Sequence, residues 1–473
     1  MKKVLLLSKA IFVLLALFFL QSYLNYTSNK EILPATAARD NSEQRQVQVV
    51  QTQIGSDFAR LQDEASLTAF SGLWPAFRGP QRDNIVTDSV PLQKTWGADG
   101  PKVLWRTGLG EGYAGAIIVN ARAYVLDYLE AENADALRCF ALLSGEELWR
   151  RYYHNPIRRN HGKSRTVPAC ANNVVVSFGP AAHVMAVEAT SGELLWTRDL
   201  IRDYGAEVPQ WYAGQCPLID GDRVILGIGG TEVLLTALDL RSGETLWELP
   251  NQHAIKMSHS SVLLAEFHGV KQYIYAGIGG ISACDDSGQL LWQNQDWKPP
   301  VWAPTPVQLD QQRLFLTAGY GAGSAILHLN YREGKFSTVL GESWKPNRGP
   351  ASEQQTPLLL DGTLITIQPK DAGARRCELV ASAISALPDI AAGSGRDHRF
   401  GLGPYLYADG ALWIMDDDGV LHVYSFADWS FTELARCKVL PGVDSWGPIA
   451  LANGIMLLRD STSMVCLDLR KEP

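Results

Sequence analysis

The middle of the chain repeats one short segment four times at nearly equal spacing. The tryptophans that end the copies are 47, 51 and 45 residues apart, a period typical of repeat architectures. In each copy we expect a strand to end, Ser-Gly to form a tight turn with glycine at a positive φ, and a new strand to carry the tryptophan. The copies are Ser144-Gly-Glu-Glu-Leu-Trp149, Ser191-Gly-Glu-Leu-Leu-Trp196, Ser242-Gly-Glu-Thr-Leu-Trp247 and Ser287-Gly-Gln-Leu-Leu-Trp292.

The repeat continues beyond these four copies. Each unit opens with proline or a small residue, then a hydrophobic strand and an Asp-Gly or similar turn, as in Cys216-Pro-Leu-Ile-Asp220-Gly. A second strand, a Gly-rich hairpin, a third strand, the Ser-Gly turn and the Trp strand complete the unit. Four antiparallel strands per unit make up a propeller blade, so we predict an all-β, eight-bladed β-propeller. Its units open near Gly115, Val167, Cys216, Ser260, Thr305, Thr356, Gly403 and Trp446.

The last unit is incomplete. It reaches Cys466-Leu-Asp-Leu-Arg470, and its fourth, Trp-bearing strand is missing. A strand of that type, Lys102-Val-Leu-Trp105-Arg-Thr107, stands alone before the first unit. We therefore predict that residues 102–107 complete the last blade and close the ring, which would remove two exposed sheet edges.

The chain divides, by composition, into three parts. Residues 1–30 begin with Lys2 and Lys3 and contain a hydrophobic run of 11 residues from Ala10 to Leu20, which is typical of a signal peptide or of a short uncleaved anchor spanning residues 4–20. Residues 31–72 are polar and predict a flexible tether, in which residues 57–70 have the pattern of a short helix. The propeller is expected over 73–473, in a periplasmic or other extracytoplasmic location at the cell membrane.

Charge and cysteine content exclude several classes of function. The net charge is −8, and beyond residue 30 it is −12, which disfavours nucleic acid and anionic membrane surfaces as partners. The seven cysteines are an odd number and none is adjacent to another. We interpret them mainly as small buried residues, with one disulfide left open.

The repeat resembles that of the pyrroloquinoline-quinone (PQQ)-like propellers. The resemblance rests on Ala237-Leu-Asp239-Leu-Arg-Ser-Gly243-Glu-Thr-Leu-Trp247 and its near copy Ala186-Val-Glu188…Gly192…Trp196. The lead-in Trp74-Pro-Ala-Phe-Arg78-Gly79 is similar to the opening of exported members. The resemblance implies that the structural tryptophans dock on neighbouring blades; these are Trp105, Trp149, Trp196, Trp247 and Trp292.

This family contains quinone-dependent dehydrogenases and a non-catalytic branch that includes the propeller lipoprotein of the outer-membrane β-barrel assembly machinery. The dehydrogenases hold PQQ and Ca²⁺ on the propeller axis, usually beneath a vicinal disulfide. This chain has no Cys-Cys pair, and no matching set of cation ligands and catalytic acid is found. The resemblance therefore implies the non-catalytic branch, with no cofactor, no metal and no catalytic residue.

Four further segments are interpreted as turns. The Gly-rich segments at 227–230, 277–280 and 319–323 occupy one position of the repeat between two strands, so they are hairpins and not phosphate loops. Asp416-Asp-Asp418-Gly419 lacks the alternating acids of a calcium loop and predicts a hairpin turn.

The unit openings approach the propeller axis, where ligands usually bind. Aromatic and polar side chains in these openings fit a binding mouth, although the same residues would also serve to plug the channel by packing. The candidate mouth consists of Tyr113, Arg165, Trp211, Tyr212, Gln215, His259, Trp302, Gln355, Arg399 and Trp446. The acids expected near the mouth are Glu353 and Asp444.

The sequence thus predicts an exported, non-enzymatic, monomeric propeller that acts as a protein-interaction scaffold at the cell envelope, with envelope proteins as partners. Two alternatives remain open. One is ligand or glycan binding at the axial mouth, and the other is a PQQ-dependent oxidoreductase. The fold does not decide among them.

Overall fold

The computed structural model describes residues 54–55, 57–62, 67, 70–157 and 162–471. The chain divides into two compact units, residues 1–47 and 48–473, and every described residue belongs to the second. The predicted signal peptide or anchor and most of the predicted tether lie outside the described residues. Among those described, no helix combines the length and hydrophobicity that a membrane crossing requires.

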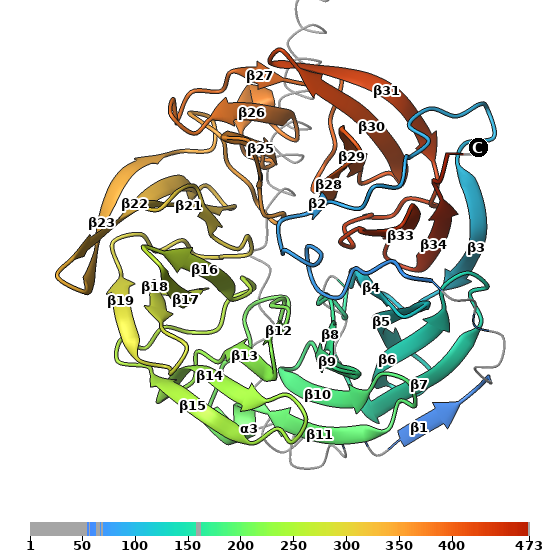
Figure 1. Ribbon diagram of the computed structural model, residues 1–473, viewed down its shortest axis with the longest axis horizontal. Helices are drawn as coiled ribbons and strands as arrows, with labels where there is room; N and C mark the ends of the chain where they lie inside the picture. The colour runs from blue at the N-terminus through green and yellow to red at the C-terminus, as the bar shows by residue number, and fades with distance from the viewer. Residues whose placement is uncertain (1–53, 56, 63–66, 68–69, 158–161, 472–473) are drawn as a thin grey trace, which may run out of the picture. The chain divides into compact units, whose positions relative to one another are not determined.

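Within the described residues the strands form eight sheets arranged around a common axis (Figure 1). Each sheet contains four antiparallel strands that follow chain order from the axis outward, except that the last sheet takes its outer strand from the start of the ring. Two sheets gain a fifth strand, one at the outer edge of blade 1 and one at the inner edge of blade 7. This confirms the predicted eight-bladed propeller.

From the inner to the outer strand, blade 1 consists of β4 (Ala116–Val119), β5 (Arg122–Leu129), β6 (Ala134–Ala141) and β7 (Glu147–His154), and blade 2 of β8 (Ala169–Ala171), β9 (Val174–Phe178), β10 (His183–Glu188) and β11 (Leu194–Asp199). Blade 3 consists of β12 (Leu218–Asp220), β13 (Arg223–Gly227), β14 (Val233–Asp239) and β15 (Thr245–Pro250), and blade 4 of β16 (Leu263–Phe267), β17 (Val270–Gly277), β18 (Gly280–Cys284) and β19 (Leu290–Asn294). Blade 5 consists of β20 (Val307–Gln308), β21 (Arg313–Ala318), β22 (Gly323–Arg332) and β23 (Lys335–Trp344), and blade 6 of β24 (Leu358–Leu360), β25 (Thr363–Ile367), β26 (Leu379–Ala383) and β27 (Ala392–Gly393). Blade 7 consists of β28 (Tyr405–Ala408), β29 (Ala411–Met415), β30 (Val420–Ala427) and β31 (Ser430–Lys438), and blade 8 of β32 (Ala450–Ala452), β33 (Ile455–Arg459), β34 (Ser463–Asp468) and β3 (Lys102–Gly108).

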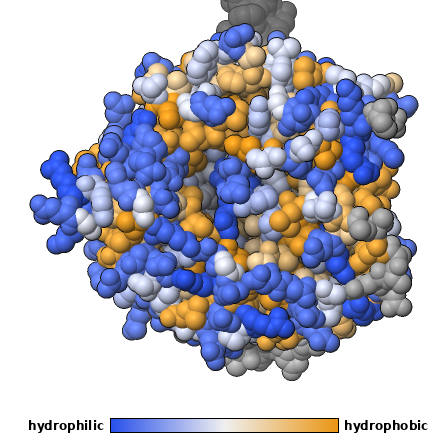
Figure 2. Space-filling model, viewed as in Figure 1, coloured by the Kyte–Doolittle hydropathy of each residue, from blue (hydrophilic) through white to orange (hydrophobic). Residues whose placement is uncertain are grey.

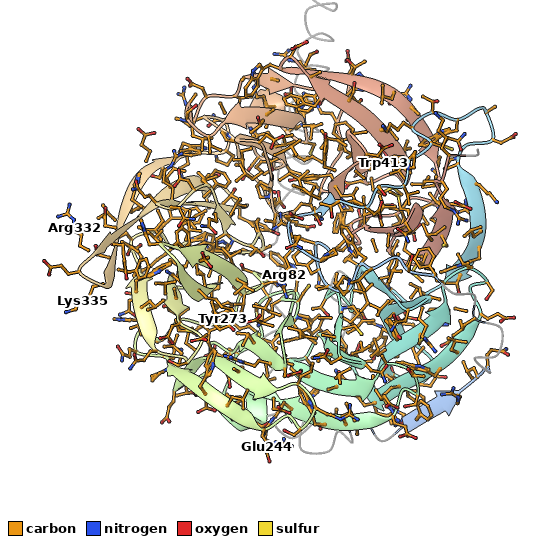
Figure 3. All side chains as sticks on the ribbon, in the orientation of Figure 1. Arg82, Glu244, Tyr273, Arg332, Lys335 and Trp413 are labelled. Atoms are coloured by element: carbon orange, nitrogen blue, oxygen red, sulfur yellow. The ribbon has the colours of Figure 1, made fainter. Side chains whose placement is uncertain are left out.

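Inner and outer strands differ in sequence pattern because they differ in burial. The second strands, such as β9 and β29, are hydrophobic apart from Ser177 of β9 and are buried at every residue, since both of their faces pack on neighbouring blades. Outer strands such as β31 alternate between exposed and partly buried residues, as expected for a sheet with one face in water. The β22–β23 hairpin extends beyond its neighbours, with Arg332 and Lys335 at its tip (Figure 3).

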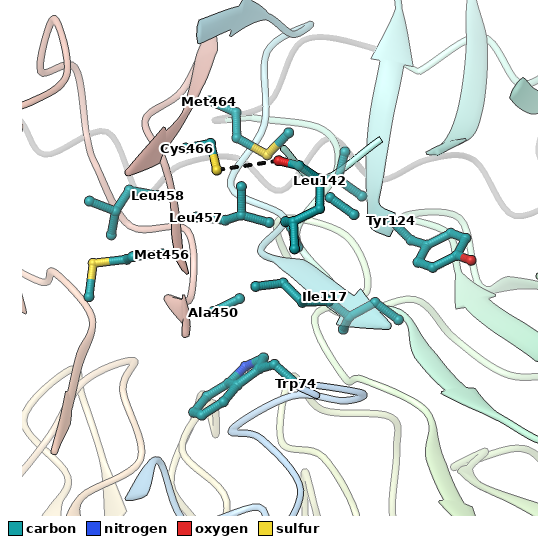
Figure 4. Packing of buried hydrophobic residues seen from close by; sticks show 14 of the residues in the cluster. Trp74, Ile117, Tyr124, Leu142, Ala450, Met456, Leu457, Leu458, Met464 and Cys466 are labelled. Atoms are coloured by element: carbon teal, nitrogen blue, oxygen red, sulfur yellow. Dashed lines mark hydrogen bonds between the residues drawn. The ribbon is translucent and has the colours of Figure 1, made fainter. Parts of the chain in front are cut away.

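The ring closes through β3. This strand pairs antiparallel with β34, with Trp105 opposite Cys466 and Gly108 opposite Ser463, so the predicted closure by residues 102–107 is confirmed. Blades 8 and 1 then share one hydrophobic cluster, shown in Figure 4. In that cluster the Cys466 thiol donates to the carbonyl of Leu142 across the junction at 3.6 Å.

The repeated tryptophan docks on the Ser-Gly turn of the next blade. Gly145 has φ 75°, and a methyl group placed on it would lie 2.6 Å from the Trp105 ring. Glycine is thus required both for its backbone conformation and for the close approach of the indole. The same contact joins Trp149 to Gly192, Trp196 to Gly243 and Trp247 to Gly288. At the fifth blade the series ends, because Trp292 instead donates to Gln272 within its own blade.

The residue opposite each docking tryptophan is small. Cys139 and Cys466 occupy this position opposite Trp149 and Trp105, as Ala237 does opposite Trp247. All seven cysteines are free thiols, and five of them are buried. The interpretation of the cysteines as small buried residues is confirmed for these five. Cys377 and Cys437 are partly exposed.

A lead-in segment, Trp74 to Val86, crosses the middle of the ring and contacts distant blades (Figure 1). Trp74 pairs with Ile118 of blade 1, and Arg78 donates to the carbonyl of Pro357 before blade 6 at 3.1 Å. Arg82 donates to the carbonyl of Ile219 in blade 3. The segment ends in β2 (Ile85–Val86), which runs parallel to β28 of blade 7. The lead-in therefore ties opposite sides of the ring together.

One short element corrects the sequence analysis. Residues within the predicted tether and its possible helix form β1 (Asp57–Arg60), which pairs antiparallel with β7 at the outer edge of blade 1. The prediction of a tether or helix is therefore wrong for these four residues. The physical reason is that the outer edge of blade 1 offers backbone hydrogen-bonding groups and Phe58 packs on Arg151. The helical elements α3 (Leu200–Tyr204) and η2 (Gly373–Arg375) are short and lie between strands.

Candidate functional site

The surface of the propeller mixes hydrophobic and hydrophilic residues on the face shown in Figure 2. A cavity of about 130 Å³ lies where the blade openings meet. Its walls come from the segments that open blades 1 to 6 and blade 8, and Phe77 of the lead-in also lines it. The aromatic and polar lining residues are Phe77, Tyr113, Arg165, Trp211, His259, Ser261, Tyr320, Glu353, Gln354, Gln355 and Trp446.

Six of the ten candidate mouth residues line this cavity. They come from six different blade openings, separated by up to 333 residues in sequence, and the circular arrangement of blades brings them to one place. They are Tyr113, Arg165, Trp211, His259, Gln355 and Trp446.

The other four residues lie elsewhere. Gln215 is fully buried, and its amide exchanges hydrogen bonds with the backbone of Gly227. Trp302 is also fully buried, edge-on to Trp297 in the core of blades 4 and 5. Arg399 donates to the carbonyl of Ala374 at 2.8 Å. Tyr212 follows Trp211 without lining the cavity. Packing between strands, which the sequence pattern does not distinguish from facing the axis, explains the positions of Gln215 and Trp302.

Further side chains reach the mouth from hairpins between the second and third strands of a blade. Tyr320 comes from the β21–β22 hairpin, Lys370 from the β25–β26 connection and Asp417 from the β29–β30 turn. Glycines or acids in the sequence indicate two of these hairpins, at 319–323 and 416–419, but no sequence pattern assigns their side chains to the mouth. The available signal was topological, because these hairpins and the blade openings lie at the same end of the strands.

Two aromatic pairs form the walls of the mouth. Trp211 and Tyr320 are stacked, with ring centroids 5.3 Å apart and planes 19° apart. Tyr113 and Trp446 meet at 4.8 Å with a 39° tilt. Trp211 has φ 64° and the next residue, Tyr212, has φ 72°. Two consecutive non-glycine residues in the left-handed region are strained, which is often seen at binding sites.

Arg165 and His259 set the electrostatics on one side of the cavity. The guanidinium of Arg165 lies 5.4 Å from the centre of the Tyr113 ring, and burial lowers its pKa to about 10. Burial, and then the charge of Arg165, lower the pKa of His259 to about 3. His259 is therefore neutral at physiological pH and can donate or accept one hydrogen bond, while Arg165 remains a cation.

Carboxylates and one lysine also lie at the mouth and contact its aromatic residues. Burial raises the pKa of Glu353 and of Asp417. Asp417 accepts a hydrogen bond from the indole of Trp446 at 2.7 Å, and the ammonium of Lys370 lies 5.3 Å from the centre of the same ring. Asp444 lies 3.5 Å from the phenol oxygen of Tyr113. The mouth therefore presents a cation and hydrogen-bonding groups between aromatic walls.

The described residues of the mouth do not fit PQQ with its calcium ion. Ca²⁺ takes six to eight oxygen ligands, but no group of three or more His, Cys, Asp or Glu in the described part of the chain has the geometry to hold a metal. One face of the Trp211 ring is already stacked on Tyr320 and is therefore not free to stack on a planar cofactor. No step of quinone chemistry can be derived from these residues.

A family model and several solved structures match this chain. Residues 133–375 match the family model described as outer membrane protein assembly factor BamB. A search of curated proteins finds no match. Among solved structures, BamB from Moraxella catarrhalis is 13% identical, with a TM-score of 0.52, and the match covers 78% of this chain and all of that chain.

Two other solved structures share the fold. Quinohemoprotein alcohol dehydrogenase ADHIIG from Pseudomonas putida HK5 is 12% identical over 85% of this chain and 81% of its own, with a TM-score of 0.55. The computationally designed Ika8 protein is 12% identical over 78% of this chain and 100% of its own, with a TM-score of 0.52. Likeness at such identities shows the fold alone, whereas the family model spans just over half of the sequence. The chain belongs to the PQQ-like propeller family described as outer membrane protein assembly factor BamB.

Proposed function

We propose that this protein is an exported scaffold of the cell envelope that binds partner proteins at the axial mouth. The observation that carries the proposal is the mouth itself, in which two aromatic pairs and Arg165 surround a cavity whose inner side is lined by Phe77 of the lead-in. Tryptophan, tyrosine and arginine are the residues that contribute most to protein–protein binding energy. Membership of the BamB family supports a protein partner over a substrate.

The size of the cavity supports the insertion of one partner side chain. A cavity of about 150 Å³ in another protein accommodates a benzene ring, and the cavity here is about 130 Å³. A protruding aromatic or aliphatic side chain would fill it, while Gln355 and Glu353 would bond to the partner backbone at the rim. Such a buried anchor surrounded by polar groups is a common form of a strong interface.

The remaining parts of the proposal concern location and assembly. We propose that residues 4–20 direct export and anchor the chain in the cell membrane, and that the propeller acts as a monomer. We also propose that the protein is not an enzyme, because the mouth residues do not fit the quinone and cation of the dehydrogenases. A small ligand or glycan is the second candidate occupant, favoured by the hydrogen-bonding groups of Glu353, His259 and Gln355 in one cavity.

Affinity purification of the full chain from membranes of its source organism tests the proposal. We expect envelope proteins to co-purify with the wild-type chain and to be lost with Trp211→Ala combined with Tyr320→Ala. Trp429→Ala is the matched control, because Trp429 is 45% exposed on the β30–β31 hairpin, away from the mouth. The proposal fails if the mouth variant retains the same partners as the control.

A further inference from the structure

The chain already binds one extended segment at the outer edge of a blade. In β1, residues Asp57 to Arg60 pair with Tyr152 to Trp149 of β7 (Figure 1). The backbone N–H groups of Leu61 and Gln62 both donate to the carbonyl of Leu148, at 2.8 and 3.2 Å. Residues 57–62 thus extend the sheet of blade 1 by strand addition, which is a general mode of peptide recognition.

An arginine and a glycine of the propeller hold the aromatic residue of this segment. Phe58 lies under the guanidinium of Arg151, whose carbon is 4.2 Å from the ring centre. Arg151 also donates to the carbonyl of Gly192 at 3.0 Å and to that of Gly55 at 3.0 Å. Gly192 belongs to the Ser-Gly turn of blade 2, and a methyl group on it would lie 2.8 Å from Phe58. Arg151 and Gly192 together form the binding site of Phe58, called the first seat, which spans the junction of blades 1 and 2.

The same seat recurs at the junction of blades 2 and 3. Arg198 stands two residues after Trp196, as Arg151 stands two residues after Trp149. Arg198 donates to the carbonyl of Gly243 at 2.6 Å, which repeats the contact of Arg151 with Gly192. Within the described part of the chain, β11 is the outer edge of its sheet and pairs only with β10.

The later blades lack this arginine. Leu249 and Asn294 occupy the corresponding positions after Trp247 and Trp292. The described part of the segment that fills the first seat lies next to the second seat, because Gly55 lies against the side chain of Leu194, the first residue of β11. The second seat is therefore specific to one edge of the propeller and lies next to an occupied one.

We propose that the edge of β11 binds an extended segment of a partner protein with an aromatic residue over Arg198. The partner strand adds to β11 as β1 adds to β7, and its aromatic ring lies between the guanidinium of Arg198 and Gly243. This inference deepens the proposed scaffold function by adding a second contact surface. It needs no contribution from the axial mouth.

A peptide with the sequence of residues 54–62 is the direct probe, because it carries the pattern that the first seat binds. Binding to the full chain is measured by fluorescence anisotropy of a labelled peptide. We expect one peptide per chain, and a loss of affinity of about three- to five-fold with Arg198→Ala, the size of one exposed arginine–aromatic contact. A peptide with alanine in place of Phe58 should lose a similar factor, and the two changes together should cost no more than either alone.

Two protein variants make the result specific. Arg202→Ala removes a nearby exposed arginine of α3 that pairs with Asp203, and it should leave binding unchanged. Arg151→Ala should also leave binding at β11 unchanged. Absence of saturable binding overturns the proposal, as does an effect of Arg151→Ala without one of Arg198→Ala, which would mean that the peptide exchanges with β1. Neither result bears on the partners lost with Trp211→Ala and Tyr320→Ala, so the two proposals fail separately.

Discussion

Each docking tryptophan packs on the turn glycine of the next blade, so substitution of either residue removes or disturbs the same contact. Trp196 is 8% exposed, packs on Gly243 and donates its indole N–H to the carbonyl of Leu240 at 2.9 Å. Trp247 makes the equivalent contacts but is only partly buried. The tryptophan at this repeat position therefore contributes more or less to stability depending on how much of its indole side chain the next blade covers.

Replacing Trp196 by alanine should destabilise the fold by about 3–5 kcal/mol, the usual cost of truncating a large buried aromatic residue. Trp247→Ala should cost less, because part of its ring is already in water. Denaturant-induced unfolding measures both, with Trp429→Ala as a control expected within about 0.5 kcal/mol of wild type. Equal and small losses for all three variants would contradict the docking contact.

A buried carboxyl group makes stability depend on pH. Asp135 is 1% exposed and accepts a hydrogen bond from the phenol of Tyr153. Burial, together with the charge of neighbouring Asp127, raises the pKa of Asp135 to about 7 against the opposing effect of the hydrogen bond from Tyr153. Between about pH 4 and pH 7 the folded chain therefore binds a proton that the unfolded chain does not, so this group contributes stability below pH 4 that is lost as the pH rises to 7.

Asp135→Asn removes this titration while keeping the shape of the side chain. The stability of the variant relative to wild type should increase on the order of 1 kcal/mol per pH unit between pH 4 and pH 7 and be constant above that range. Unfolding curves at four pH values measure the difference. A difference that is independent of pH would show that Asp135 is ionised in the folded chain.

At the scale of elements, ring closure depends on the turn that receives Trp105. Gly145 and Gly221 both have a positive φ, but only Gly145 has an indole within reach of an added methyl group. Gly221→Ala should cost about 1–2 kcal/mol from backbone conformation. Gly145→Ala should cost about 1–3 kcal/mol more because it overpacks the junction of blades 8 and 1.

Thermal unfolding of the two glycine variants compares them directly. Both variants place alanine at a positive φ, so the cost of backbone strain is common to them. The difference in their stability therefore measures the effect on the contact with Trp105. If Gly145→Ala were no less stable than Gly221→Ala, the tryptophan of the closing strand would not contribute to closure.

Sequence periodicity predicted the blades and the closing strand because each blade repeats the same hydrophobic runs and turns. It did not predict β1, since four residues carry too little pattern and their partner strand is about 90 residues away in the chain. The positions of the blade openings correctly predicted six of the residues that line the mouth, but they gave no indication of Tyr320 and Asp417. Those two lie in turns whose glycines and acids indicate a hairpin, and nothing local shows that their side chains face the axis.

At the scale of the whole molecule, the ring presents a mouth on its axis while the lead-in crosses its middle and ties distant blades together. The dehydrogenases of this fold use the axis for a quinone and a cation. Here the axis carries a stacked Trp211–Tyr320 pair and two carboxyl groups whose pKa is raised by burial. Burial raises the pKa of these groups because it destabilises the charged form, which is the form that a hard cation binds.

We therefore expect no calcium-dependent binding of PQQ. Titration of the full chain with PQQ at micromolar concentration, with and without Ca²⁺, should leave tryptophan fluorescence the same in both conditions. Calcium-dependent quenching that is abolished by Glu353→Gln or Asp444→Asn would contradict this expectation. It would favour the hypothesis that the protein is a PQQ-dependent oxidoreductase.

The central claim is that partner proteins contact the axial mouth, and site-specific photo-crosslinking tests it most directly. A photoreactive amino acid placed at Tyr320, which is 51% exposed at the mouth, should give discrete crosslinked products with envelope proteins in intact cells. The same amino acid at Trp429 should not, and Arg165→Ala should weaken the products formed at position 320. Products that form equally at both positions, or that persist unchanged with Arg165→Ala, would contradict the claim.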